Sequence, residues 1–557
     1  AFSRKPGSYY HHPEKNKIKP GSLLMNFTAS AISYKQTKAF SKLAIDYIEG
    51  ADALEPFFTF APNLDGIKNA ISQRKKFTVN RQVLVTQLQK QYNAKKQGLK
   101  TTANIELLLN ENTFTVTTAH QPNIFTGHLY FVYKIIHAIK LADDLKKQFP
   151  KNNFVPVFFM GSEDADLEEL GTINVHGKIY KWDTAQKGAV GRMQVDEEFI
   201  ALINELDAQL GVEEHGEEIL NKVRQAYAKG KNIEQSTFDL VHDLFADYGL
   251  VVFLPDNPVF KKELTPVIKK ELSEQFSQKA MQQALAALSG LYKMQVAGRQ
   301  VNLFYLLDGL RERLERKGDG FIVHGTDLRF TQQEILQELK NHPERFSPNV
   351  ILRPVFQEML LPNIIFIGGG AEIAYWLELK NVFAEAGVFF PVLMLRNSFT
   401  VIPKKIAEKI QSLGLNEASL FETGNKLKDY YVKKETKYQL SLSDEKLALI
   451  KIYHNIRESA TKVNPTFSRH VWALQQKSKQ KLDELEKKML RSEKLKFDAG
   501  LRQISKIKDR LFPGDKLQER VDNLLPYYAL YGKGFLDVLY THSGAWQQQY
   551  CILTETE

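Results

Sequence analysis

The chain has 557 residues, of which 43% are hydrophobic and 25% charged, and its formal net charge is +10. This length exceeds one typical core, so we expect two to four structural units. No apolar run is long enough to span a bilayer, which predicts a soluble, cytoplasmic protein. The single cysteine, Cys551, excludes an internal disulfide framework and a zinc site built from several thiolates.

The positive charge favours anionic partners, but its distribution argues against a nucleic-acid surface. The lysines concentrate in residues 477–508, where glutamate and aspartate interrupt them. Such mixed runs are typical of a solvated helix face. We therefore expect small-molecule ligands, and neither nucleic acid nor a membrane as a partner.

The first part of the chain contains no candidate functional residues. Residues 1–24 are polar and basic without the apolar centre of a signal peptide, and we expect a disordered extension or an expression remnant there. Residues 25–111 are predicted to form a helical segment, because apolar residues recur at helical spacing in 34–48 and 80–92.

The predicted core spans residues 112–442 and begins with a strand, a polar turn and a helix. The strand covers 113–117, and the helix carries its apolar side from Ile135 to Leu141. A helix start offers unpaired N–H groups and a positive dipole end, although an ordinary solvated loop would have the same composition. The candidate ligand-binding residues here are His120, Gln121, Asn123, Thr126, Gly127, His128 and Tyr130.

An acidic run follows the next strand. Residues 154–160 are apolar without interruption, which predicts a strand buried on both faces of a parallel sheet. Glu163, Asp164 and Asp166 come directly after it, so we expect them to share a crevice with the first turn. Carboxylates there could bind an ammonium group, hold Mg²⁺ with phosphate or act as a base, whereas capping of a helix is the alternative.

Residues 177–293 are predicted to form an inserted, mainly helical lobe, from which 249–254 returns as a strand of the central sheet. Two short strands, 300–305 and 320–323, are predicted around a polar connection at 306–319. A last strand is predicted within 388–395.

A third polar concentration surrounds three glycines. The apolar stretch 360–367 leads into them and then into a helix, which would let an anionic oxygen approach bare backbone N–H groups. The spacing fits neither GxGxxG nor a P-loop, and a tight turn would explain the glycines equally well. The candidate binding residues are Asn349, Arg353, Gln357, Gly368, Gly369, Gly370, Glu372 and Trp376.

Beyond residue 443 the pattern changes to long, charged helices. Apolar residues recur at three- and four-residue steps in 444–460 and 471–511, with Pro465 between them. This predicts an antiparallel coiled coil over residues 443–511 that makes an oligomer contact. Residues 512–557, rich in aromatics, are predicted to pack back on the core.

Four of these motifs, in this order, resemble the bacillithiol biosynthesis family BshC. They are the turn from His120 to Tyr130, the acidic run from Ser162 to Glu169, residues 346–354, and the glycine turn up to Trp376. The resemblance implies an α/β fold with a Rossmann-like parallel-sheet core, similar to class I synthetases, with helical insertions and a C-terminal α-helical coiled coil that forms a homodimer. It also implies a cysteine ligase that joins cysteine to glucosaminyl-malate, with ATP or ADP and Mg²⁺ as candidate cofactors. Zinc is not expected, because Cys551 is the only thiol.

The resemblance also suggests roles for single residues. Class I synthetases bind ATP phosphates with a HIGH tetrapeptide, whose second half matches Gly127 and His128, while Phe125 replaces its first histidine and no convincing KMSKS segment occurs. We expect Asp164 and Asp166 to hold the substrate amine and His128 to meet phosphate or carboxylate. Arg353 would pair with the malate carboxylates through its planar fork. No protein metal site is expected.

Two other function classes remain open at this point. A metal-dependent hydrolase of a small amide or sugar substrate could use His120, His128, Asp164 and Asp166. A non-catalytic coiled-coil scaffold, or a nucleic-acid binder, could exploit the positive charge.

Overall fold

The computed structural model describes residues 27–95, 98–296 and 298–556, so the predicted extension at 1–24 lies outside the described residues. At its centre is a five-stranded sheet with the order β13-β12-β2-β3-β6, in which every neighbouring pair is parallel. The strands are β2 (Thr113–His120), β3 (Asn153–Met160), β6 (Val251–Phe253), β12 (Asn363–Gly368) and β13 (Val392–Leu395). The first strand is three residues longer than predicted, so His120 is its last residue and not part of the turn.

The order of the strands defines a crevice. From β2 the chain passes through α6 (Leu129–Gln148) to β3 and then to β6, and it returns later to β12 and β13 on the other side of β2. Helix α16 (Gly370–Glu378) follows β12. This arrangement confirms the Rossmann-like core. The order in which the strands are added reverses between β2 and β12, and sheets of this kind bind ligands at such a point, beyond the carboxyl ends of the strands.

The N-terminal segment is mainly helical but contains a strand that its sequence pattern does not predict. Strand β1 (Phe27–Ser33) pairs antiparallel with β15 (Gln549–Glu555), which also pairs with β14 (Phe399–Ile402). The partner lies more than 500 residues away, so no local pattern reveals the pairing. The helices are α1 (Tyr34–Thr37), α2 (Lys42–Ile48), α3 (Leu64–Arg74), α4 (Arg81–Tyr92) and α5 (Leu99–Leu107).

Two helical groups and a second sheet lie between β3 and β12. The longer helices are α8 (Glu197–Leu210), α9 (Gly216–Ala226), α10 (Ile233–Phe245), α11 (Pro258–Glu263), α12 (Thr265–Glu274), α13 (Phe276–Leu288), α14 (Gln332–Asn341) and α15 (Arg353–Leu360). The antiparallel sheet contains β7 (Leu303–Leu307), β8 (Leu310–Lys317), β9 (Gly320–Val323), β10 (Arg329–Thr331) and β11 (Phe346–Pro348). The predicted polar connection at 306–319 is therefore wrong, since most of it is β8. Its side chains are largely half-exposed, so they form no apolar run.

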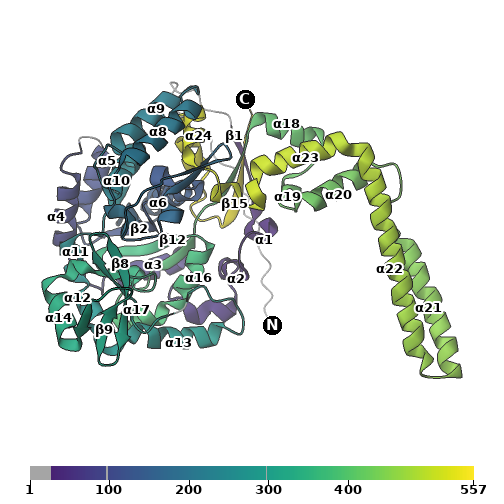
Figure 1. Ribbon diagram of the computed structural model, residues 1–557, viewed down its shortest axis with the longest axis horizontal. Coiled ribbons are helices and arrows are strands. Elements are labelled where there is room, and N and C mark those ends of the chain that lie inside the picture. The colour runs from purple at the N-terminus through teal and green to yellow at the C-terminus, as the bar shows by residue number, and fades with distance from the viewer. Residues whose placement is uncertain (1–26, 96–97, 297, 557) are drawn as a thin grey trace.

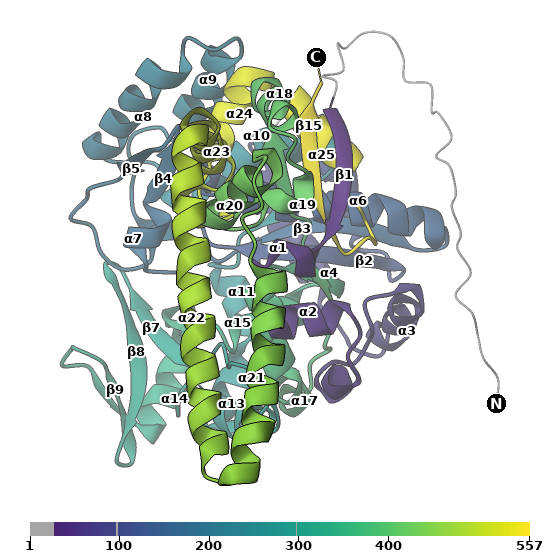
Figure 2. The same cartoon turned by 90° about the vertical axis from the view of Figure 1, so that its right-hand side faces the viewer.

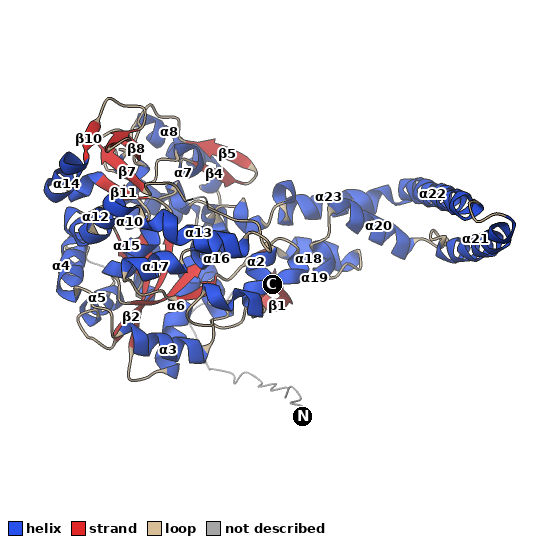
Figure 3. Cartoon of the chain, turned by 90° about the horizontal axis from the view of Figure 1, so that it is seen from below, coloured by secondary structure: helices blue, strands red, loops and turns tan. Residues whose placement is uncertain are grey.

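The C-terminal part forms an arm and then returns to the core. Helices α21 (Ser443–Val463) and α22 (Phe467–Lys494) pack as an antiparallel hairpin that projects from the globular part (Figure 1), and the view from below shows its tip far from the central sheet (Figure 3). Figure 2 shows the two helices running alongside each other. The predicted C-terminal coiled coil is confirmed, and its two paired helices cover residues 443–494. Within the described residues, no helix has the length and apolarity to cross a bilayer.

Several shorter helices link this arm to the core. They are α18 (Lys404–Ser412), α19 (Glu417–Leu420), α20 (Gly424–Glu435) and α23 (Asp498–Leu511). After α23 the chain returns as α24 (Leu524–Tyr531) and α25 (Gly534–His542), which contact α9 and α6 respectively. Segments far apart in the sequence thus meet beside α6.

Candidate active site

The turn after β2 has a strained backbone. Phe125, Thr126 and Gly127 have φ angles of 50°, 69° and 61°, a region that costs a non-glycine residue about 1–2 kcal/mol. A Cβ atom on Gly127 would lie 2.7 Å from the Cβ of Asn123, so only glycine fits there. The buried Phe125 ring packs against that of Tyr227 with the centroids 5.1 Å apart. The residue in place of the first HIGH histidine therefore anchors the turn in the core.

Three polar atoms near this turn have unused hydrogen-bonding capacity. His120 Nε2, Asn123 Oδ1 and Thr126 Oγ1 are buried, and none has a hydrogen-bond partner within the described part of the chain. Buried polar groups are normally satisfied, so such atoms mark a place where a ligand can bind. Burial, together with the nearby charges of Lys134 and Arg353, lowers the pKa of His120 well below its ordinary value. His120 is therefore a neutral imidazole.

His128 stands at the start of α6, as predicted, but its hydrogen bond restricts its role. Its Nδ1 lies 3.2 Å from the carbonyl oxygen of Val521, which can only accept a hydrogen bond. Burial lowers the pKa of His128, so the neutral ring carries its proton on Nδ1 and presents Nε2 as an acceptor. In this form Nε2 suits an amine or hydroxyl donor better than an anion.

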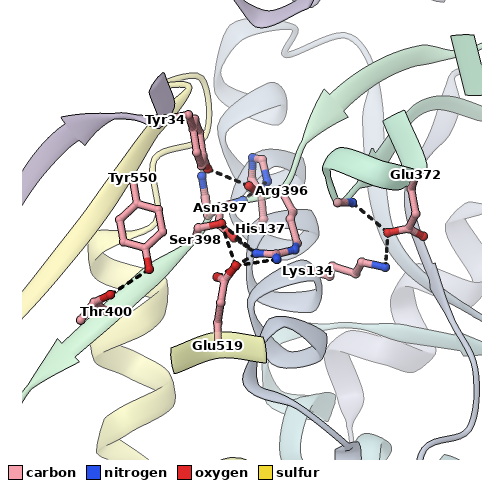
Figure 4. A network of polar contacts seen from close by, with 11 residues as sticks. Tyr34, Lys134, His137, Glu372, Arg396, Asn397, Ser398, Thr400, Glu519 and Tyr550 are labelled. Carbon is pink, nitrogen blue, oxygen red and sulfur yellow. Dashed lines mark hydrogen bonds and ion pairs between the residues drawn. The ribbon is translucent and has the colours of Figure 1, made fainter. Parts of the chain in front are cut away.

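Two buried cations lie beside the crevice between β2 and β12 (Figure 4). Lys134, on α6, is paired with Glu372 and donates to the carbonyl of Ala119 at 3.0 Å. Glu372 also accepts from the backbone N–H of Gly369 at 2.8 Å, which fixes the start of α16. Burial lowers the pKa of Lys134.

The second cation, Arg396, follows β13 and binds Glu519 with two hydrogen bonds of 2.9 and 2.7 Å. Its guanidinium carbon lies 5.3 Å from the centre of the Tyr130 ring, and burial raises the pKa of Tyr130 to about 12. Sequence reasoning missed Lys134 and Arg396 as site residues. The available signal was a lysine among the apolar residues of α6 and an arginine at the end of a buried strand.

The acidic run divides into three different environments. Asp164 accepts a hydrogen bond from Gln121 Nε2 at 3.1 Å, so the structure brings the turn after β2 and the acidic run together. Asp166 is exposed and caps the short helix α7 (Leu167–Leu170) through the N–H of Glu169 at 3.1 Å. The capping interpretation therefore applies to Asp166.

Glu163 is buried and paired with Lys261, whose Nζ also donates to the carbonyl of Phe346 at 2.9 Å. Burial raises the pKa of Glu163. This pair joins the end of β3 to α11 and β11. We therefore interpret it as a structural support for the crevice.

A cavity of about 100 Å³ lies between this loop and the second sheet. Its polar lining residues are Gln121, Glu163, Asp164, Arg311, Asn349 and Arg353. Arg353 donates to the Tyr375 hydroxyl at 3.1 Å, and Arg311 donates from Nε to the Ser347 hydroxyl at 3.1 Å. Asn349 accepts from the N–H of Ile351 at 2.9 Å and so shapes the turn before Arg353. The sequence did not point to Arg311, because it lies in the unpredicted strand β8.

The other predicted residues of the glycine region support the core. Gln357 is buried and donates to Glu358 at 2.9 Å. Trp376 is 1% exposed and stacks on Phe366 with centroids 4.1 Å apart. Gly368 and Gly370 are buried, whereas the half-buried Gly369 forms the N-cap of α16. Of this group, Gly369 and Glu372 lie near Lys134, and Arg353 and Asn349 lie at the cavity.

The hydrolase alternative finds no support in this geometry. Among the residues that the structure describes, no group of three or more His, Cys, Asp or Glu side chains could hold a metal ion. His128 is bonded to a main-chain carbonyl, and Asp166 is a helix cap. The scaffold alternative is likewise unsupported, since buried charged groups converge on a crevice in the core.

Comparison with known proteins gives the same family over both parts of the chain. Residues 27–397 match the model of the bacillithiol biosynthesis BshC N-terminal Rossmann-like domain, and residues 399–555 match that of the BshC C-terminal coiled-coil domain. A solved structure from Campylobacter jejuni, titled a "putative arginyl t-RNA synthetase", matches 79% of this chain and 97% of its own at 7% identity. Its TM-score of 0.22 is too low for this likeness to carry an argument.

Similar proteins named "Putative cysteine ligase BshC" occur in several bacteria. The protein of Flavobacterium psychrophilum is 38% identical over 91% of this chain and 96% of its own length. That of Flavobacterium johnsoniae is 37% identical over 94% and 99%, and that of Bacillus anthracis is 26% identical over 91% and 97%. With both domain models matched in order, the chain belongs to the BshC family of bacillithiol biosynthesis proteins.

Proposed function

We propose that the protein is a cysteine ligase that forms an amide between the carboxyl group of cysteine and the amine of glucosaminyl-malate. The observation that carries this proposal is the cavity at the carboxyl edge of the sheet, where the carboxylate of Asp164 lies with the guanidinium groups of Arg311 and Arg353. An acid beside two arginines is complementary to a substrate that has one amine and two carboxylates.

Each group of the cavity has a role in this proposal. Arg353 and Arg311 bind the malate carboxylates, because a planar guanidinium donates two parallel hydrogen bonds to a carboxylate. Asp164 binds the substrate ammonium and accepts a proton as the amine becomes a nucleophile. Gln121, which donates to Asp164, holds that carboxylate in place. His128 offers its neutral Nε2 as a further acceptor.

ATP, when bound, supplies the activation of the cysteine carboxyl. The residue that would hold its phosphates is Lys134, beside the first turn of α16, because cations and helix N-termini favour anions. The N–H groups of Leu129 and Gly369 are not available for this, since they bond to Asp522 and Glu372. The Thr126 hydroxyl has no hydrogen-bond partner among the described residues, and it could donate to a phosphate oxygen of the same ligand. Any Mg²⁺ would arrive with the phosphates, since it is typically held through few protein carboxylates.

The hairpin arm supports a further proposal, that the protein forms a homodimer. Its exposed apolar side chains include Leu447, Ile452 and Trp472, which are 62%, 57% and 52% exposed. A second hairpin would cover them, as in other coiled coils. Sedimentation of the wild type and of Ile452→Ser tests this, and a monomeric wild type would contradict it. We place the reaction in the cytoplasm, where both ATP and cysteine are available.

Deletion of the gene and measurement of low-molecular-weight thiols test the proposed reaction. We expect bacillithiol to disappear and glucosaminyl-malate to accumulate, and the wild-type gene to restore both levels. Asp164→Ala should fail to restore them, whereas Asp166→Ala, the matched control two residues away, should succeed. Normal bacillithiol in the deletion strain would refute the proposal.

A further inference from the structure

The strained turn after β2 is held by a segment from the far end of the chain. Asn523 is fully buried at the start of α24. Its Nδ2 donates to the carbonyl oxygen of Phe125 at 2.9 Å and to that of Gly127. Its Oδ1 accepts from the N–H of Leu525 at 2.8 Å. One side-chain amide therefore uses both donors on the two residues that flank Thr126.

These bonds act where the backbone most needs support. Phe125 and Thr126 have positive φ angles, which non-glycine residues keep only when their surroundings impose them. Because Asn523 donates to the carbonyl oxygens on both sides of Thr126, it fixes the backbone of the whole turn. Thr126 itself is 1% exposed, and its hydroxyl bonds to no other residue in the described ranges.

The two residues before Asn523 bind the next part of the same loop. The carbonyl of Val521 accepts from His128, and that of Asp522 accepts from the N–H of Leu129 at 2.8 Å. Residues 521–523 thus fix both the turn and the start of α6. They belong to the part of the chain that matches the coiled-coil family model, whereas the turn belongs to the Rossmann-like part.

We propose that Asn523 is a positioning residue, which holds the turn of residues 125–127 in its strained form and thereby presents Thr126 and His128 to the substrates. The chemical step that this serves rests on the proposed ligase function. The conformation of the turn does not depend on it, so the two claims can be tested apart.

The test uses a substitution that preserves side-chain shape. Asn523→Asp keeps an acceptor for Leu525 but places an oxygen against two carbonyl oxygens. Gln518→Glu is the matched control, because Gln518 is also fully buried and bonds to both backbone groups of Val401, at 2.8 and 3.1 Å, without touching the turn. If Asn523→Asp does not fold, Asn523→Ala replaces it, since alanine removes the donors without burying a charge.

Two readouts are needed, namely hydrogen exchange of a peptide spanning residues 123–131 and kcat and KM for glucosaminyl-malate and ATP. For the Asn523 variant we expect at least tenfold faster exchange of this peptide and at least a tenfold loss of kcat/KM. The Gln518 variant should stay within twofold of wild type in both. Unchanged exchange in the Asn523 variant, or equal losses in both variants, would overturn the proposal. If the wild type shows no ligase turnover, the proposed function fails, and hydrogen exchange alone decides the role of Asn523.

Discussion

In the core, the side chains of Arg396 and Glu519 are 3% and 0% exposed and pair across 123 positions of the chain. In the arm, the side chains of Lys481 and Glu484 are 71% and 43% exposed and pair within a single helical turn. Both are ion pairs, but water surrounds one and is excluded from the other. A charge that is buried must keep its partner, whereas an exposed charge is solvated when its partner is lost.

This difference shows where the chemically informative charges lie. The net charge of +10 and the lysine-rich arm reflect mainly solvated helix surfaces. The few buried charges, by contrast, hold the crevice in shape and link remote segments. Lys134 pairs with Glu372, and Lys261 pairs with Glu163, each between different elements of the core.

The largest effect is expected when one partner of the buried pair is removed. Arg396→Met leaves Glu519 buried without its cation, which should lower the free energy of unfolding by about 3–5 kcal/mol. Urea denaturation of the wild type and the variant measures this. A loss below about 1 kcal/mol, the range of exposed pairs, would show that the core pair is no different from a surface pair.

Glu358 is a buried acid that has no salt-bridge partner among the residues that the structure describes. Burial raises its pKa to about 7 from an ordinary value of 4.5. Between those two pH values the folded protein holds the proton more tightly than the unfolded chain, so stability falls as pH rises through this window. The expected loss is about 3 kcal/mol. In Glu358→Gln, the free energy of unfolding should therefore fall less between pH 5 and pH 8 than it does in the wild type. An equal fall in both proteins would contradict the raised pKa of Glu358.

Asp164 and Asp166 lie in different environments, so the same substitution by asparagine should have unequal effects at the two positions. Asp164→Asn should reduce kcat/KM at least 100-fold, or about 2.7 kcal/mol, because Asp164 lies at the cavity. Asp166→Asn should change it less than threefold, since that side chain caps an exposed helix. Product formation measured by mass spectrometry decides between them. Because asparagine caps a helix as well as aspartate does, equal losses would mean that the negative charge of the whole acidic run, and not the carboxylate in the cavity, matters for the reaction.

The smallest effect is expected in the arm. Lys481→Met removes the exposed partner of Glu484, and water then solvates the remaining carboxylate. We expect the urea midpoint and kcat/KM to equal those of the wild type. A clear loss of either would show that the arm contributes more than a solvated surface at this position.

Local patterns in the sequence predicted the elements that depend on local residues. The buried strand at 154–160, the helix after the first turn and the hairpin arm all follow from the spacing of apolar residues. The acidic run and the first turn were predicted to share a crevice, and the bond between Gln121 and Asp164 joins them.

Other features depend on contacts between distant residues. Strand β1 needs its partner at the C-terminus, and Arg311 enters the cavity from a strand whose polar pattern resembles a loop. Asn523 lies almost 400 positions from the turn that it holds. Likewise, nothing in the sequence distinguishes Asp164 from Asp166, because their difference arises from which one meets Gln121.

The central claim is that the amine and the malate carboxylates of glucosaminyl-malate bind at the cavity beside Asp164. A crystal structure of the protein with this ligand tests it most directly. We predict that the malate carboxylates lie within hydrogen-bond distance of Arg353 and Arg311 and that the amine faces Asp164. A ligand bound at the arm, or at the opposite edge of the sheet, would contradict the account.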